Sequence, residues 1–217
     1  MDIAANIAAV QRRVAAAAAR VGRDPAGVRL IAVSKTQPAE RVQAAIAAGA
    51  RDIGENYVQE AAAKRDAIGA AVRWHLIGHL QRNKAARALE LFDLIHSVDT
   101  VSLGEALARH AAARGTPARV LVEVNVGGEA SKRGVSPAAL PALLEGLRDP
   151  HLVVEGLMTV PPPGAAERTR GYFRQLRALR DAAGLPELSM GMTDDFEIAI
   201  EEGATMVRVG RAIFGER

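Results

Sequence analysis

The sequence predicts a (β/α)8 barrel, the TIM-barrel fold, with one extra helix at its N-terminus. Eight short apolar runs alternate with segments of helical periodicity rich in Ala, Leu, Arg and Glu, which is typical of parallel sheets covered by helices. The runs cover residues 28–34, 51–54, 73–78, 92–96, 119–125, 152–158, 187–190 and 205–209. A doubly wound open sheet is the competing fold. The turn after the first run reads Ser-Lys-Thr-Gln-Pro and lacks a glycine-rich dinucleotide motif, which argues against that alternative.

The extra helix is expected over residues 2–21. Ile3, Ile7, Val10 and Val14 recur at the spacing of one helix face, and Gly22 follows where the helix should end. We find no domain boundary and expect a single domain over residues 1–217. The proline-rich stretch 161–164 follows the sixth run directly and is predicted to be a loop within the barrel.

Later helices carry their own start and stop signals. Ser102 and Glu105 have the spacing of a capping box, and Ser136 precedes a proline suited to a first helical turn. Glycines are expected to end helices at positions 49, 115 and 203.

Composition excludes several classes of function. Aromatic residues make up only 3% of the chain, which disfavours base stacking, and 28 basic against 25 acidic side chains leave a net charge of only +3. The absence of cysteine excludes disulfides and thiolate chemistry. The sequence shows neither a signal peptide nor a membrane-spanning run. We therefore expect a cytoplasmic protein that binds neither nucleic acid nor membrane, and a monomer because the Ala-rich outer helices show no apolar face.

In a barrel of this kind, functional residues gather at the C-terminal ends of the strands. Lys35 stands just after the first apolar run. A lysine at the mouth of a closed sheet can form a Schiff base with an aldehyde. An ordinary solvated lysine past a strand end is the common alternative, and this segment alone favours it.

Two turns near the C-terminus suit an anion. Ser189-Met190-Gly191-Met192-Thr193 and Gly210-Arg211 both combine glycine with the start of a helix, where backbone N–H groups lack intrahelical acceptors. The loops after strands seven and eight often bind phosphate in this fold. Ordinary turn chemistry explains the same residues about equally well.

Arg208 lies inside the last apolar run, where an unpaired guanidinium would be costly to bury. It could pair with Glu123 or another inward acid, be exposed, or face a ligand atom as a fixed cation. His75 and His79 are four residues apart but lie on a strand and loop, so we do not predict a metal site.

The complete set of motifs resembles the pyridoxal phosphate homeostasis protein family over essentially the whole chain. The matching segments are Ala32-Val33-Ser34-Lys35-Thr36, Gly54-Glu55-Asn56-Tyr57, Trp74-His75-Leu76-Ile77-Gly78-His79, Val98-Asp99-Thr100, Val124-Asn125-Val126, Gly156-Leu157-Met158, residues 189–195 and residues 207–215.

The resemblance implies the fold of the N-terminal domain of bacterial alanine racemase, holding pyridoxal 5′-phosphate (PLP). It implies that Lys35 is the Schiff-base lysine and that Arg208 faces the pyridine nitrogen. The phosphate would be held by Ser189, Thr193, Gly210 and Arg211, with Asn56 beside the ring and Met192 near the phosphate turn. Thr193 stands where the family more often has serine. Residues 127–134 keep the family's Glu129 and Lys132 in a small-residue version.

The resemblance implies a protein that carries or buffers PLP for vitamin B6 homeostasis, without catalytic residues, and with apo PLP-dependent enzymes as possible recipients. The racemase takes a catalytic tyrosine from a second domain, which we do not expect here because the chain ends at Arg217, just after the barrel. A PLP-dependent amino-acid racemase or other weak PLP enzyme is the alternative. A PLP-free enzyme that binds phosphate is a third possibility.

Overall fold

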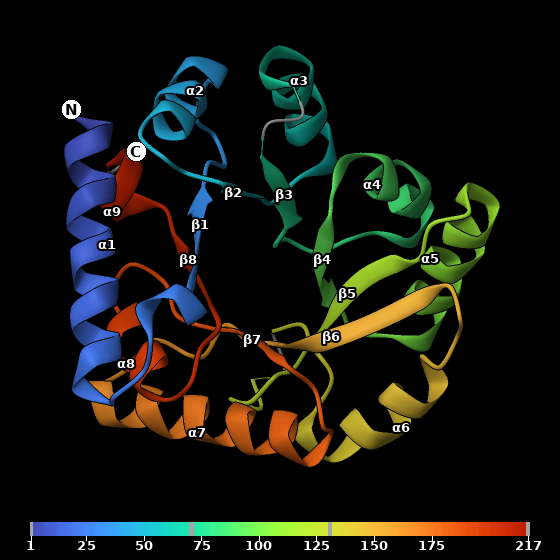
Figure 1. The fold of residues 1–217 in the computed structure, drawn as a ribbon. Helices are drawn as coiled ribbons and strands as arrows, with labels where there is room; N and C mark the ends of the chain where they lie inside the picture. The colour runs from blue at the N-terminus through green and yellow to red at the C-terminus, as the bar shows by residue number, and fades with distance from the viewer. Residues whose placement is uncertain (1, 70–71, 130–131, 216–217) are drawn as a thin grey trace.

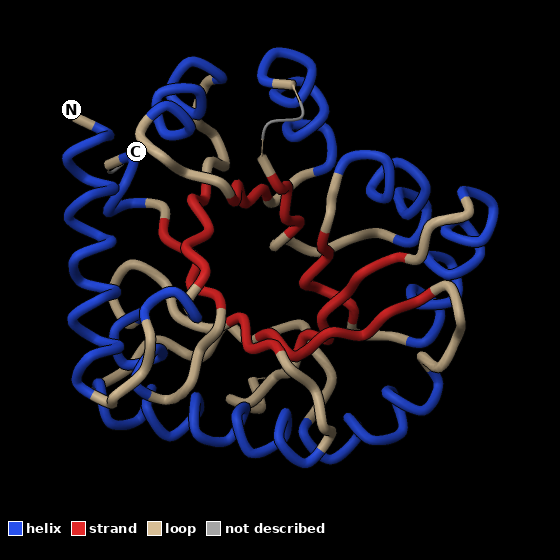
Figure 2. Tube along the Cα trace, viewed as in Figure 1, coloured by secondary structure: helices blue, strands red, loops and turns tan. Residues whose placement is uncertain are grey.

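Eight parallel strands close into a barrel in sequence order, β1 to β8 (Figures 1 and 2). The computed structural model describes residues 2–69, 72–129 and 132–215. The strands are β1 Arg29–Val33, β2 Asp52–Glu55, β3 Arg73–Leu76, β4 Leu94–Val98, β5 Ala118–Glu123, β6 Leu152–Met158, β7 Glu187–Ser189 and β8 Met206–Val209. Each lies within two residues of an apolar run, so the predicted barrel is confirmed.

Helices surround the strands (Figure 2). They are α1 Ile3–Arg20, α2 Ala39–Ala47, α3 Val58–Ile68, α4 Ala85–Leu91, α5 Val101–Arg114, α6 Leu140–Gly146, α7 Ala166–Ala182, α8 Phe196–Glu201 and α9 Arg211–Phe214, with short 3-10 turns at Pro25–Gly27, Arg82–Lys84 and Pro137–Ala139. The extra N-terminal helix is confirmed as α1, and Asp2 caps its start by accepting from the Ala5 N–H.

One predicted cap is wrong. Thr100 begins α5 by accepting a hydrogen bond from the Leu103 N–H, so Ser102 lies inside the first turn and cannot cap it. Gly115 ends the same helix in the left-handed conformation, as predicted.

The core has two apolar parts. The larger part packs the outer faces of the strands against the helices, and the smaller part lies inside the barrel. This inner cluster consists of Ile31, Leu94, Leu121, Met158 and Met206. Polar side chains also lie inside the barrel, among them His75, His96 and Ser189.

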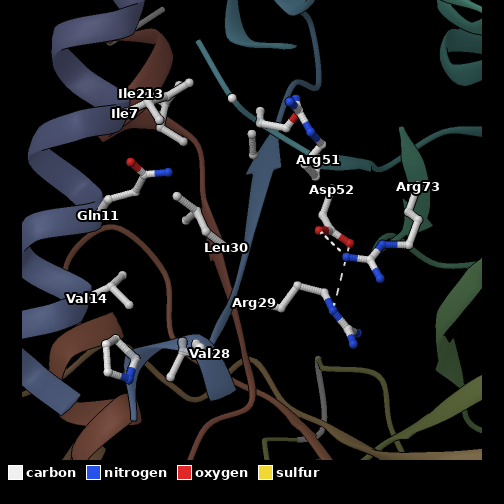
Figure 3. A pocket seen from close by; sticks show the side chains of 15 residues that line it. Ile7, Gln11, Val14, Val28, Arg29, Leu30, Arg51, Asp52, Arg73 and Ile213 are labelled. Atoms are coloured by element: carbon white, nitrogen blue, oxygen red, sulfur yellow. Dashed lines mark hydrogen bonds and ion pairs between the residues drawn. The ribbon is translucent and has the colours of Figure 1, made fainter. Parts of the chain in front are cut away.

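Helix α1 packs on the outside of the barrel against α8 and α9, so the N-terminal and C-terminal segments of the chain are in contact. The Asn6 amide donates to the Ile213 carbonyl of α9 at 2.9 Å. A cavity of about 490 Å3 lies between α1 and the N-terminal ends of the strands (Figure 3). Arg29 and Arg73 face Asp52 there, and Arg51 is a third arginine in the lining, so cationic side chains outnumber the carboxylate. None of the helices in the described part of the chain combines the length and apolar character needed to cross a bilayer.

Leu121→Ala is expected to lower the free energy of unfolding by about 2–5 kcal/mol, because it opens a void among fully buried side chains inside the barrel. Val153→Ala on neighbouring β6 is the matched control, since Val153 is largely exposed and should cost less than about 0.5 kcal/mol. Urea denaturation of both variants tests this. Similar losses in the two would contradict the assignment of Leu121 to a packed interior.

Candidate functional site

A cavity of about 720 Å3 lies at the C-terminal ends of the strands. This volume suits a small organic ligand. Its lining includes seven of the eight cofactor-binding residues that the sequence predicts, drawn from segments far apart in the chain. The lining residues are Val33, Lys35, Asn56, Ile77, Val160, Met192, Thr193, Asp194, Arg208, Gly210 and Arg211.

The eighth predicted residue, Ser189, is placed elsewhere. Ser189 is fully buried, its Oγ accepts from Arg208 Nη1 at 2.6 Å, and it lies 2.9 Å from His96 Nδ1. Ser189 is not among the residues that line the cavity, and its contact with a phosphate remains a prediction.

The cavity lining is electropositive. It contains three cationic side chains, Lys35, Arg208 and Arg211, and one carboxylate, Asp194, which forms an ion pair with Arg211. Arg208 is the buried member of this set, whereas Lys35 is half-buried and Arg211 is exposed. Such a lining favours an anionic ligand.

Lys35 follows β1 in a turn whose backbone is fixed on both sides. Thr36 has a φ of 64°, an unusual value for a β-branched residue. Its N–H donates to Glu60 Oε2 at 3.0 Å, and Lys64 Nζ donates to the Ser34 carbonyl at 2.6 Å. Helix α3 thus holds the residue before Lys35 and the residue after it.

A buried ion pair stabilises these contacts between α3 and the residues on either side of Lys35. Glu55 is fully buried at the end of β2 and its Oε1 accepts from Lys64 Nζ at 2.6 Å and from Ser34 Oγ at 2.5 Å. Burial raises the pKa of Glu55, although its bonds to Lys64 and Ser34 oppose the shift. Sequence reasoning missed Lys64, because a lysine on a polar-looking helix gives no sign that its ammonium is buried.

Arg208 projects from β8 and is held by the last residue of β7 and by the residue that follows β6. Its Nη1 donates to Ser189 Oγ and its Nη2 donates to the Thr159 carbonyl at 2.8 Å. Burial lowers the pKa of Arg208 to about 10, so the guanidinium stays charged at neutral pH. Among the alternatives left open by the sequence, the structure shows a buried cation bonded to neutral groups and lining the cavity.

Glu123 lies at the end of β5, near this cation. Burial and the nearby Asp99 carboxylate raise the pKa of Glu123 to about 6, against the opposing effect of Arg208. Glu123 is not among the residues that line the cavity.

The turn after β7 needs glycine. Gly191 has a φ of 92°, and a Cβ there would lie 2.5 Å from the Ala199 Cβ. The Gly191 carbonyl accepts from the Arg208 N–H at 2.9 Å, which ties this turn to β8. The Met192 N–H donates to Asp195 Oδ1 at 2.6 Å, so Asp195 shapes the turn on which Thr193 is displayed. Gly210, the residue before α9, also lines the cavity.

The two histidines considered for a metal are separated by the fold. His75 is buried in the barrel and bonds to Asp52, whereas His79 is exposed in the loop that follows. Within the described residues, no group of three or more His, Asp or Glu side chains is arranged to hold a metal ion. In the loop after β5, Glu129 and Lys132 form an ion pair at 2.8 Å, while Ala130 and Ser131 lie outside the described residues.

The barrel, with a lysine after β1 and a buried arginine in β8, defines the structural class of the alanine racemase N-terminal domain. The family model for the alanine racemase N-terminal domain matches residues 5–217 of this chain. A curated relative, the pyridoxal phosphate homeostasis protein of Pseudomonas aeruginosa, is 48% identical over 220 residues, covering 99% of this chain and 96% of that protein. The chain belongs to the pyridoxal phosphate homeostasis protein family, as the sequence motifs predicted.

Solved structures agree with this membership. PipY of Synechococcus elongatus with PLP bound has a TM-score of 0.86 and 38% identity, covering 98% of this chain and all (100%) of that one. An alanine racemase of Clostridium difficile has a TM-score of 0.74 over 100% of this chain and 57% of its own, at 14% identity, which shows the shared fold alone.

Lys64→Met is expected to destabilise the protein by about 3 kcal/mol, because it leaves the Glu55 carboxylate buried without its partner. The folded-state pKa of Glu55, already raised, should rise further. A carboxyl with a raised folded pKa contributes stability at low pH that is lost as the pH rises through that pKa. The loss measured by urea denaturation should therefore be smaller at about pH 4 than at about pH 8.

The double variant Glu55→Gln with Lys64→Met is the control, because it removes the charge that the single change strands. It should recover part of the stability and abolish the pH dependence. An equal loss at both pH values in the single variant would contradict the buried pair.

Proposed function

We propose that this chain binds PLP in the cavity at the C-terminal end of its barrel and carries or buffers it within the cell. The observation that supports this most directly is the convergence of Lys35, Arg208 and the two glycine turns on one electropositive cavity. The naming of the Pseudomonas relative and the PLP-bound PipY structure support the same ligand.

The donor set fits PLP group by group. Thr193, the start of α9 at Gly210 and the Arg211 side chain offer a hydroxyl, backbone N–H groups and a cation for a phosphate. The Lys35 amine stands in the same lining, and the cofactor supplies an aldehyde to which a lysine can bind covalently and reversibly. Asn56 and the apolar Val33 and Ile77 would border the ring.

Arg208 would serve the pyridine nitrogen. A guanidinium has only donors and stays charged, so it can donate to an unprotonated ring nitrogen but cannot accept a proton from a protonated one. An unprotonated ring withdraws electrons less strongly, which suits storage of the cofactor more than carbanion chemistry.

The position of the tyrosines supports a carrier over a racemase. Tyr57 is exposed before α3, and Tyr172 packs on the outer core from α7. Neither lines the cavity, so neither stands ready as a base for a bound substrate. Monomeric state, cytoplasmic location and delivery to apo PLP-dependent enzymes remain predictions from the sequence.

Reconstitution with PLP followed by borohydride reduction and peptide mapping should place the cofactor on Lys35. Lys35→Ala should lose this label and the visible absorbance of lysine-bound cofactor. Lys84→Ala, in the turn before α4, is the matched control and should keep both. Labelling of Lys84 or Lys132 with Lys35 untouched would overturn the site, and no absorbance after reconstitution would overturn the ligand.

The reconstituted protein should not racemise or transaminate amino acids at an ordinary enzyme rate, which is about 1 s−1 or more. Chiral chromatography of each amino acid after incubation measures this. Turnover above that rate, lost in Lys35→Ala, would replace the carrier function with the PLP enzyme.

A further inference from the structure

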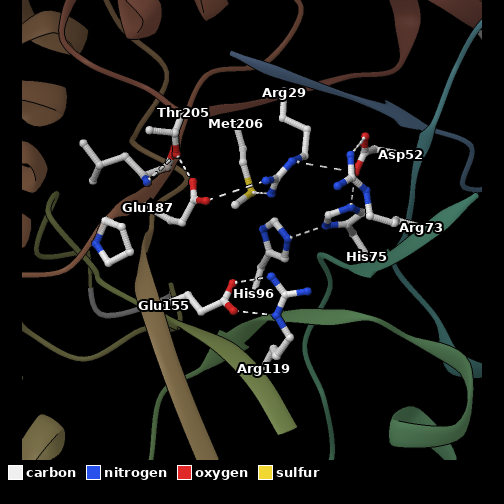
Figure 4. A network of polar contacts seen from close by, with 12 residues as sticks. Arg29, Asp52, Arg73, His75, His96, Arg119, Glu155, Glu187, Thr205 and Met206 are labelled. Carbon is white, nitrogen blue, oxygen red and sulfur yellow. Dashed lines mark hydrogen bonds and ion pairs between the residues drawn. The ribbon is translucent and has the colours of Figure 1, made fainter. Parts of the chain in front are cut away.

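A continuous line of polar side chains crosses the barrel interior below the cavity. Asp52 Oδ1 lies 2.8 Å from His75 Nε2, and His75 Nδ1 lies 3.0 Å from His96 Nε2. His96 Nδ1 lies 2.9 Å from Ser189 Oγ, which accepts from Arg208 Nη1 at 2.6 Å. Figure 4 shows the lower part of this line, from Asp52 through His75 to His96. We call these five side chains the interior chain.

The interior chain runs through the lumen and not along its wall. His96 is on β4 and Ser189 ends β7, and these strands are not neighbours in the closed barrel. Their contact must therefore cross the inside. The interior chain begins at Asp52, at the N-terminal end of β2, and ends at Arg208, which lines the cofactor cavity. It therefore connects the two ends of the barrel.

Donors and acceptors give the chain one direction. Arg208 can only donate, and an ionised Asp52 can only accept. With Asp52 ionised and both imidazoles neutral, His75 must carry its proton on Nε2 to donate to Asp52, and its Nδ1 then accepts from His96 Nε2–H. His96 Nδ1 in turn accepts from the Ser189 hydroxyl, whose oxygen accepts from Arg208. Every bond then points from the cation to the carboxylate, and such chains strengthen cooperatively.

The electrostatic surroundings favour this neutral state. Burial lowers the pKa of His96 well below its ordinary value, with His75, Arg208 and Arg29 adding to the shift. Burial also lowers the pKa of His75, with Arg29 and Arg73 adding to the shift, although the bond to Asp52 opposes it. The hydrogen bonds from His75 and Arg73 outweigh burial and lower the pKa of Asp52.

Two further carboxylates, Glu123 and Asp195, lie close enough to Arg208 to oppose the lowering of its pKa. Other charged groups lie nearer the N-terminal end of the barrel and pair among themselves. Arg119 pairs with Glu155, and Arg29 lies 3.7 Å from Glu187 (Figure 4). A proton added to His75 would reverse two bonds of the interior chain, because His75 Nδ1 would donate to His96 and His96 Nδ1 would donate to Ser189, while His75 Nε2 would still donate to Asp52. Acidification would thus remove the single direction that the neutral chain has.

We infer that His75, His96 and Ser189 are positioning residues that hold the Arg208 guanidinium in one orientation beneath the cavity, through a one-way hydrogen-bonded chain anchored on Asp52. The part of this inference that concerns the cofactor ring rests on the proposed function. The part that concerns the chain itself does not, and can be tested without cofactor.

The first test is NMR of the apo protein labelled with 15N-histidine. At pH 7 both imidazoles should be neutral with the proton on Nε2, and Ser189→Ala should perturb the His96 signals most strongly. Ser102→Ala, at an exposed position on α5, should leave both imidazole signals in place. A charged imidazole, or a proton on Nδ1 of either residue at pH 7, would overturn the one-way chain.

The second test uses PLP labelled with 15N in its ring. Ser189→Ala and His96→Phe should move the ring-nitrogen signal and weaken PLP binding about tenfold, the effect of losing one hydrogen bond to a charged group. Leu121→Ala, which destabilises the same interior without cutting the chain, should leave the signal at its wild-type position. If His96→Phe does not fold, Ser189→Ala decides the outcome alone.

An unchanged ring signal in folded Ser189→Ala would refute the positioning role even if the tautomers are as expected. Failure of wild-type protein to bind PLP would instead refute the proposed function. The NMR measurements on the apo protein would still decide whether the interior chain has the expected proton positions.

Discussion

The buried charge of Arg208 is the constraint on which the interior of this barrel depends. A guanidinium removed from water must be met by acceptors, and the structure supplies the Ser189 hydroxyl and the Thr159 carbonyl. The hydroxyl lies in turn against His96, and the line ends only at the carboxylate of Asp52. One cation at the cavity is therefore connected by hydrogen bonds to polar side chains on four other strands, β2, β3, β4 and β7.

The two cations central to the proposed site are held in different ways. Lys35 is half-buried in the cavity lining, and the backbone around it is fixed through Thr36, Glu60 and the buried Lys64. Arg208 is fixed by its own side-chain bonds from inside the barrel. This difference agrees with the proposed roles of the two residues, in which Lys35 binds and releases the cofactor and Arg208 keeps one position.

The strands were predictable because each is a short apolar run and the C-terminal ends of parallel strands meet on one face. That rule placed Lys35, Asn56 and Arg208 at one cavity. It could not foresee the contact between His96 and Ser189, the last residue of β7, because the two residues are 93 positions apart in the sequence. The buried position of Lys64 was missed for a related reason. Its bond to Glu55 joins a strand to the next helix, and no local sequence pattern indicates such a contact.

The lining also limits what the cavity can do to a bound molecule. General acid–base catalysis needs a group at the reaction centre that exchanges protons near neutral pH. Among the described lining residues, burial lowers the pKa of Arg208 only to about 10, so it stays charged, and Asp194 is paired with Arg211. Glu123, whose pKa of about 6 would suit the task, lies outside the lining. Lys35 is the lining residue able to bind an aldehyde covalently and release it again, which agrees with the carrier function proposed above.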